Sequence, residues 1–245
     1  MAVYVVGDIH GCFDEWMELK NKIEKQDESA KFILLGDIVD RGHKQKEMLD
    51  WALENITLNG KYQMIMGNHE EMKLELKWIV EESKEEYGDI LDNYGWLLYL
   101  SDKNVSPERV IEYIEWMEKL PLYKDITVNG RRFIIVHGGV SNSSIEDNKI
   151  KEDISRNIRR DLIWNRDCDN NSGLKDTTIV HGHTPTLLRE AFKTEDSYKF
   201  QELMGKIYST NNKYNLDCGL VFKHSKSNLA ALKLDTLEEI YLYEV

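Results

Sequence analysis

Five short apolar runs, each ending in a glycine beside side chains that can bind metal, constrain this chain more than any other feature of its sequence. An apolar run that stops at a glycine is typical of a buried strand that ends in a turn, so the polar residues should lie where a sheet meets solvent. The five segments are residues 3–11, 32–42, 62–70, 133–139 and 178–185. This pattern predicts an α/β fold in which the ends of several strands carry polar side chains.

The segment from Gly36 to Gly42 contains the most demanding of these strand ends. Burying Asp37 near a second carboxylate, Asp40, and near Arg41 costs free energy unless something compensates the charges. A metal ion would do so for Asp37, and a bound phosphate would do so for Arg41. Taken alone, the segment also fits a strand followed by a salt-bridged turn.

Apolar residues at helical spacing lie between the strand-like runs. They predict helices at about 13–23, 48–56 and 106–117, the last with Ser106 as its N-cap and Pro107 in its first turn. The order strand, polar loop, helix, strand is that of a β-α-β unit with its polar loop at the carboxyl end of the strand.

The sequence of the second half of the chain predicts mostly short strands and loops. Asn129-Gly130 predicts a tight hairpin between strands at 123–128 and 131–136. Residues 141–176 are polar and predicted to form loops. Short strands of a second sheet are expected at 207–208, 216–222, 229–234 and 240–243.

Length and composition narrow the class of protein. A chain of 245 residues can bury a large core, and its even composition predicts one domain over residues 1–245. The net charge of -12 argues against non-specific binding to nucleic acid. The apolar runs are too short to span a membrane and the first residues lack the pattern of a signal peptide, so we expect a cytoplasmic protein. The three cysteines, Cys12, Cys168 and Cys218, suit reduced thiols.

Half of the excess negative charge lies between Glu70 and Asp92, where nine acidic residues accompany three lysines. Such a run is usually a solvated helix face. The alternative is that it flanks the mouth of the active site and favours substrates with basic flanks.

The five strand-end segments, in this order, resemble the signature of the metallophosphoesterases. Within that superfamily they look like the phosphoprotein phosphatase branch, and specifically like bacterial and phage serine/threonine protein phosphatases. The resemblance runs from residue 3 to about residue 235. It implies a four-layer α/β/β/α sandwich of two mixed sheets, with a small helical cap at about 71–122.

Six residues at these strand ends form a donor set of three oxygen-bearing and three imidazole side chains, which suits two divalent ions such as manganese, iron or zinc and is too rich in nitrogen for calcium. Manganese is the expected metal. The resemblance implies that Asp8 and His10 hold one ion. It implies that the other ion is held by Asn68, His137 and His183, and that Asp37 bridges the two ions. It also implies hydrolysis by in-line attack of a hydroxide that bridges the two ions.

The remaining charged residues of the motifs fit the other half of such a reaction. The resemblance implies that His69 protonates the leaving group and that Asp40 raises the pKa of His69. Arg41 and Arg166 would bind the non-reacting phosphate oxygens as bidentate donors. Arg160 is the alternative to Arg166, whose assignment depends on the similarity of Trp164-Asn165-Arg166-Asp167 to a phage segment.

Two histidines depart from the family pattern. His43 stands where bacterial relatives often have proline, and His181 stands where an apolar residue is common. Either could add an imidazole near the site, and their roles stay open. The C-terminal tail that closes the site in eukaryotic members is not recognisable in this sequence.

These features predict a metal-dependent phosphomonoesterase that acts on phosphoserine and phosphothreonine in proteins, with no nucleic-acid or membrane partner and an oligomeric state left open. The nearest alternative is a hydrolase of dinucleoside polyphosphates such as diadenosine tetraphosphate. In one branch of that alternative the position of Asp40 is commonly alanine, so its presence favours the phosphatase. A silent binding scaffold would require lost ligands, and none is lost. Phosphodiester cleavage is less expected, because diesterase branches typically carry a different histidine pair from Gly182-His183-Thr184.

Overall fold

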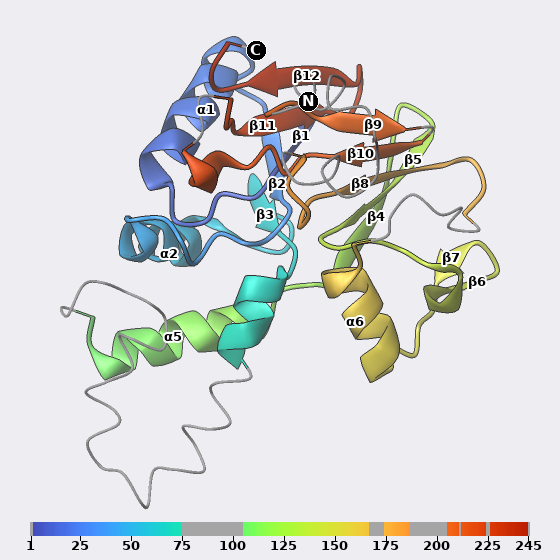
Figure 1. Cartoon of the computed structure of the whole chain (residues 1–245), viewed down its shortest axis with the longest axis horizontal. Coiled ribbons are helices and arrows are strands. Elements are labelled where there is room, and N and C mark those ends of the chain that lie inside the picture. Colours follow the sequence, from blue (N-terminus) through green and yellow to red (C-terminus); the bar gives the residue numbers. More distant parts are fainter. Residues whose placement is uncertain are drawn as a thin grey trace, which may run out of the picture.

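The computed structural model describes residues 2–74, 105–166, 174–186, 205–210, 212–223 and 226–244. Two five-stranded mixed sheets form its centre (Figure 1). The first sheet has the strand order β12-β11-β1-β2-β3, in which β1, β2 and β3 are parallel to one another. β11 is antiparallel to both of its neighbours, β1 and β12. The strands of this sheet are β1 (Val3–Val6), β2 (Lys31–Leu34), β3 (Tyr62–Met64), β11 (Ala230–Lys233) and β12 (Glu238–Tyr241).

The second sheet has the order β4-β5-β8-β10-β9, with β5, β8 and β10 parallel and an antiparallel strand at each edge. Its strands are β4 (Tyr123–Val128), β5 (Arg131–Val136), β8 (Thr177–His181), β9 (Tyr208–Thr210) and β10 (Lys213–Asn215). A two-stranded ribbon of β6 (Ile145–Glu146) and β7 (Lys149–Ile150) stands apart from both sheets.

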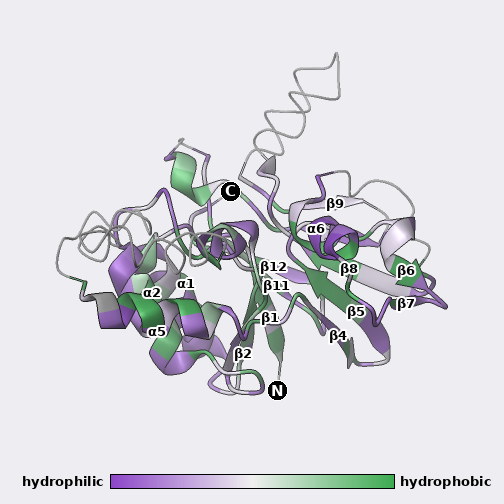
Figure 2. Cartoon of the chain, turned by 90° about the horizontal axis from the view of Figure 1, so that it is seen from below, coloured by the Kyte–Doolittle hydropathy of each residue, from purple (hydrophilic) through white to green (hydrophobic). Residues whose placement is uncertain are grey.

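Each sheet contributes side chains to two different cores, because successive side chains along a strand point to opposite faces of the sheet. In β1, Tyr4 and Val6 join the core beneath the helices, whereas Val5 joins the core between the sheets. In β5, Phe133 joins the core between the sheets and Ile134 joins a third core on the outer face. The central strands are therefore apolar on both faces, as their continuous apolar runs in the sequence require (Figure 2).

Helices cover the outer face of each sheet. The first sheet is covered by α1 (Phe13–Gln26), α2 (Gln45–Asn55) and α5 (Pro107–Met117), and the second by α6 (Arg156–Trp164), which lies on the opposite side of the molecule (Figure 1). The result is the α/β/β/α sandwich that the family resemblance implies. No helix among the described residues is long and apolar enough to cross a membrane.

Several local predictions agree with the structure. The hairpin at Asn129-Gly130 pairs Val128 with Arg131 across the turn, and both turn residues have positive φ, as a tight hairpin requires. Ser106 caps α5 by accepting a hydrogen bond from the backbone N–H of Arg109. The apolar residues at helical spacing in α5 are Val110, Ile111, Ile114 and Met117, and all but Ile111 are buried; Ile111 is exposed and Tyr113 is buried.

Two predictions about the second half of the chain are wrong. The stretch at 141–176 is not only loop, because α6 and the β6-β7 ribbon lie within it. The C-terminal strands do not form one sheet: β9 and β10 join the second sheet, while β11 and β12 extend the first beside β1. Residues 216–222 form no strand, and their last three residues, Leu220–Phe222, are a short 3-10 helix.

The single domain and its helical cap stay predictions. The described part of the cap segment includes α5, which packs with α1 and α2 in one hydrophobic core rather than standing apart from them. Residues 75–104, which hold the rest of the cap and most of the acidic run, lie outside the described residues, as does Cys168.

Candidate metal centre

The six predicted metal ligands lie in or at the end of five loops that follow β1, β2, β3, β5 and β8, and Asn68, at the end of the third loop, is the first residue of a helix described to residue 74. Parallel strands end at the same edge of a sheet, so these loops collect their polar residues where the two sheets meet. All six side chains are buried, and none exposes more than 5% of its surface. The six residues are Asp8, His10, Asp37, Asn68, His137 and His183.

Two groups of metal-binding atoms form around Asp37. Its carboxylate lies with His10 and His69 in one group and with His137 and His183 in the other, and in each group the ligand atoms lie within 4.8 Å of one another. Asp37 Oδ2 is 3.7 Å from His10 Nε2, and Asp37 Oδ1 is 3.4 Å from His137 Nε2. A residue shared by both groups has the position that a bridging ligand needs.

Asn68 contacts both histidines of the second group. Its Oδ1 lies 2.9 Å from His137 Nε2 and 2.7 Å from His183 Nδ1. His137 Nδ1 donates to the carbonyl of Leu35 at 2.8 Å, which fixes the ring and directs Nε2 toward the centre. This is the arrangement by which a backbone carbonyl orients a histidine that ligates metal.

Seven buried side-chain atoms lack a hydrogen-bond partner among the described residues, and two of them belong to predicted ligands. These two are Asp8 Oδ1 and His183 Nε2. The other oxygen of Asp8 accepts the backbone N–H of His183 at 3.1 Å. Buried polar atoms without partners are costly unless an ion or ligand satisfies them, so the donor set fits divalent metal.

The charges of the centre also call for a cation. Burial lowers the pKa of His137, but the carboxylates of Asp37 and Asp8 outweigh it and raise that pKa to about 10. Burial and the neighbouring Asp217 hold the pKa of Asp8 well above its usual range. The acidic groups thus draw a proton onto His137, and a divalent ion would supply the same positive charge.

His10 offers a neutral imidazole to such an ion. Burial and the nearby Arg41 lower its pKa to about 4, despite the charge of Asp37. Its Nδ1 donates to the carbonyl of Val39 at 2.9 Å, so Nε2 carries the free lone pair. In the structure that lone pair accepts a hydrogen bond from Arg41 Nη1 at 2.6 Å, which metal binding by His10 Nε2 would replace.

The backbone is strained at this centre. Five residues of the site have φ between 49° and 70°, the left-handed region that costs a non-glycine residue about 1–2 kcal/mol. These residues are His10, Asp37, Asp40, Arg41 and His183. Strain in so many neighbours persists only because the surrounding packing and hydrogen bonds enforce it.

Glu70 enforces much of this geometry, and sequence reasoning gave it no role. It is completely buried and accepts backbone N–H groups from Asp37 at 2.7 Å, Ile38 at 2.9 Å and Gly67 at 3.1 Å. Gly67 has no room for a side chain, since a Cβ there would lie 2.3 Å from the backbone nitrogen of Asp37. The sequence feature that could have pointed to Glu70 is its position directly after the Asn68-His69 pair.

His69 is held by the carboxylate of Asp40, and its role as general acid stays a prediction. Its Nδ1 donates to Asp40 Oδ2 at 2.7 Å, and its Nε2 accepts from Arg41 Nη2 at 3.0 Å. The second oxygen of Asp40 contacts Nζ of Lys73 at 2.6 Å, and Lys73 is 3% exposed. Lys73 was missed because it lies in the acidic run, where a lysine indicates only a solvated helix.

The other predicted residues are placed less centrally. Arg166 Nη1 donates to the carbonyl of His183 at 3.3 Å, which puts it beside the second ligand group. His43 is exposed, and His181 is buried with its Nδ1 3.3 Å from the carbonyl of Gly182. Within the described residues, neither His43 nor His181 joins a metal-binding group. Asp217, buried near Asp8 with its pKa raised to about 6 mainly by burial, is a further residue that the sequence did not single out.

Residues 1–217 match the family model of calcineurin-like phosphoesterases. The chain belongs to that family. The family implies a hydrolase with a dinuclear divalent metal centre, and the two groups around Asp37 are the described residues that could form it.

Among curated proteins, the chain is 31% identical over 141 residues to a symmetrical bis(5'-nucleosyl)-tetraphosphatase of Buchnera aphidicola subsp. Baizongia pistaciae. The match covers 57% of this chain and 44% of that relative, so this chain spans less than half of the relative's length.

Among solved structures, a putative diadenosine tetraphosphatase aligns over 98% of this chain and 92% of its own, with a TM-score of 0.56 and 17% identity. A cold-active protein-tyrosine phosphatase of a psychrophilic Shewanella species aligns over 99% of this chain and 80% of its own, with a TM-score of 0.54 and 17% identity. These likenesses show the fold. They do not distinguish between nucleotide and protein substrates.

Proposed function

We propose that this chain hydrolyses dinucleoside polyphosphates, with diadenosine tetraphosphate as the model substrate, rather than phosphoproteins. The observation that carries the phosphoester chemistry is the buried convergence on Asp37 of ligand atoms from both sheets, with Arg41 beside them. The substrate class is supported by the symmetrical tetraphosphatase to which 141 residues of the chain are similar.

The proposed ligands are Asp8, His10, Asp37, Asn68, His137 and His183, with Asp37 common to both ions. Bound there, two divalent ions, with manganese as the first to test, would activate water and neutralise phosphate oxygens. The chain's own residues then hold the substrate in line.

Arg41 is the proposed phosphate donor. Both of its terminal nitrogens point into the site, one to His10 Nε2 at 2.6 Å and the other to His69 Nε2 at 3.0 Å. A guanidinium with two parallel donors matches two oxygens of a phosphate. Arg166, at the carbonyl of His183, can reach the opposite side of the same group.

His69 is the proposed proton donor to the leaving group. Asp40 fixes its Nδ1, so Nε2 is the nitrogen that would carry the transferred proton. Since Nε2 accepts from Arg41 in this structure, the acid role requires Arg41 to turn toward substrate. Arg41 therefore couples substrate binding to the release of His69.

A phosphoserine and phosphothreonine phosphatase is the second candidate, because one observation favours it. The leaving group of a phosphoanhydride is itself a phosphate and needs little help from an acid, whereas a serine alkoxide needs a proton. A buried Asp40-His69 pair joined at 2.7 Å is the device that an alkoxide requires.

The test compares kcat/KM of the manganese-loaded protein for diadenosine tetraphosphate, for phosphoserine peptides and for a bis-aryl phosphodiester. The proposal requires the dinucleotide to give the highest value. A higher value for any phosphopeptide would replace it with the second candidate, and a preference for the diester would remove both.

A further inference from the structure

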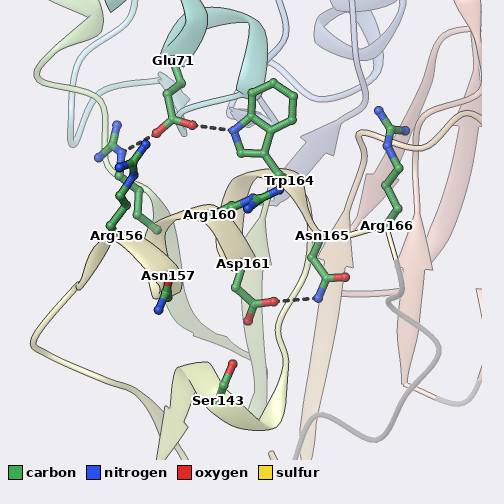
Figure 3. Close-up of a pocket in the computed structure, with 10 residues that line it drawn as sticks. Glu71, Ser143, Arg156, Asn157, Arg160, Asp161, Trp164, Asn165 and Arg166 are labelled. Carbon is green, nitrogen blue, oxygen red and sulfur yellow. Dashed lines mark hydrogen bonds and ion pairs between the residues drawn. The ribbon is translucent and has the colours of Figure 1, made fainter. Parts of the chain in front are cut away.

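A cavity of about 990 Å³ lies beside the metal centre, between α6 and the helical segment at 68–74 that carries Glu71 (Figure 3). Its lining includes four arginines, Arg156, Arg159, Arg160 and Arg166, and two carboxylates, Glu71 and Asp161. The lining therefore carries a net positive charge of two in a chain whose net charge is -12. This contrast indicates an anion as the natural occupant.

The carboxylates of the lining are already engaged. Glu71 pairs with Arg159 and accepts from the indole nitrogen of Trp164 at 2.6 Å. Asp161 accepts from the backbone N–H of Ser141 and from the side chain of Asn165, each at 2.9 Å (Figure 3). They do not neutralise the remaining arginines.

Arg156 and Arg160 are exposed and pair with no carboxylate among the residues that the structure describes. They are four positions apart on α6, so they lie on the same helix face, where like charges destabilise a helix by a few tenths of a kcal/mol. The first turn of α6 contains Arg156 and no acidic residue, an arrangement opposed to the helix dipole. A bound anion would reverse both penalties.

The cavity adjoins the predicted active site through two of its lining residues, Trp164 and Arg166. Trp164 lines it and packs edge-on against the ring of His183, with their centroids 6.1 Å apart. Arg166 lines it while donating to the carbonyl of that same histidine. The opposite side of α6 buries Ile158 and Leu162, which pack in the core on the outer face of the second sheet, while Ile163 joins the core of the first sheet and its helices.

We infer that this cavity binds the phosphates of a polyphosphate substrate that are not themselves hydrolysed, with Arg156 and Arg160 as the specificity-determining residues. The inference rests on the proposed dinucleotide activity. It explains how a chain whose arginines at the metal centre, Arg41 and Arg166, serve the single reacting phosphate can hold a substrate with several negative charges. A phosphomonoester has no group to place there.

The test combines kinetics with direct binding. In the manganese-loaded protein, Arg156→Ala with Arg160→Ala should lower kcat/KM for diadenosine tetraphosphate by about tenfold or more, mainly through KM, as expected for lost charge-assisted bonds to phosphate. The value for p-nitrophenyl phosphate should change by less than about twofold, because that substrate does not extend into the cavity. Calorimetry with sodium tripolyphosphate should show the same loss of affinity in the double variant.

Arg131→Ala is the matched control. Arg131 is an exposed arginine at the start of β5, the end of the strand opposite to His137, and its removal changes the net charge without touching the cavity. It should leave both substrates and tripolyphosphate unaffected.

The inference is overturned if the double variant retains the wild-type affinity for tripolyphosphate, or if its kcat/KM falls equally for both substrates. A failure of the proposed function looks different. The wild type would then hydrolyse p-nitrophenyl phosphate but not the dinucleotide, and the tripolyphosphate titration would still decide whether the arginines form an anion site.

Discussion

The ligand cluster around Asp37 and the cavity on α6 lie side by side but are built in opposite ways. The cluster is buried, carries left-handed backbone at His10, Asp37 and His183, and is fixed by backbone hydrogen bonds to Glu70. The cavity presents exposed arginines from a regular helix. Groups that must meet a reacting atom are held rigidly by the core, whereas groups that only attract charge can stand in solvent.

This contrast predicts different sensitivities. A buried donor in a strained loop cannot be replaced without loss of geometry, and salt screens it little. An exposed arginine contributes through a field that falls off over about 8–10 Å at moderate salt. The following changes test that division, from the largest expected effect to the smallest.

Asp37→Asn should lower activity by roughly a thousandfold, because Asp37 is the residue common to both ligand groups and the amide offers one oxygen instead of a charged pair. Metal analysis after manganese saturation should show fewer ions per chain than in the wild type. Asp147→Asn is the control, since Asp147 also has positive φ but lies exposed between β6 and β7. Normal metal content in Asp37→Asn would contradict the bridging role.

His69→Asn should lower turnover of an alkyl phosphate by roughly a hundredfold, the usual contribution of a general acid, with little change in metal content. The loss should shrink for p-nitrophenyl phosphate, whose leaving group needs no proton. Parallel assays of the two substrates measure this difference. Equal losses would assign His69 to the metal group with His10 and Asp37 instead.

Lys73→Met should lower turnover of an alkyl phosphate by about tenfold, since the Asp40 carboxylate would keep His69 as its one side-chain partner among the described residues and position it less well. The buried carboxylate left with one partner should also cost about 1–3 kcal/mol of unfolding free energy. Urea unfolding and the ratio of alkyl to nitrophenyl turnover measure the two effects. A stability loss with an unchanged ratio would make Lys73 purely structural.

Raising salt from about 0.05 M to about 0.5 M should lower kcat/KM for diadenosine tetraphosphate by about threefold and leave p-nitrophenyl phosphate nearly unchanged, because salt screens the exposed arginines of α6, which contact only the dinucleotide. The Arg156→Ala, Arg160→Ala double variant should lose this dependence. A salt effect of the same size in that variant would place the attraction elsewhere on the surface.

Much of the predicted chemistry follows from short stretches of sequence. An apolar run, a glycine and a metal-type side chain specify a buried strand with a polar end, and Asn129-Gly130 specifies its hairpin through local backbone preferences alone. The prediction that donors from five such ends converge needs only the rule that parallel strands end at one edge.

The errors occurred where the deciding partner is remote in sequence. β11 and β12 pair beside β1, more than 200 positions away, and nothing local in their sequence distinguishes the two sheets. α6 was missed because its buried residues are only Ile158, Leu162 and Ile163 among charged residues, too few to stand out before two separate cores cover them.

By itself, therefore, the sequence determined the strand ends, their donors and the family's chemistry, because those depend on neighbours a few residues apart. Only the tertiary structure decided that Lys73 contacts Asp40, that Glu70 fixes the loop of Asp37, and that the arginines of α6 line a cavity beside His183. Each of these depends on two loops meeting in space. The charges of Lys73 and Glu70 act strongly on their partners because burial removes water from around them, whereas the exposed arginines of α6 act together through their position on one cavity.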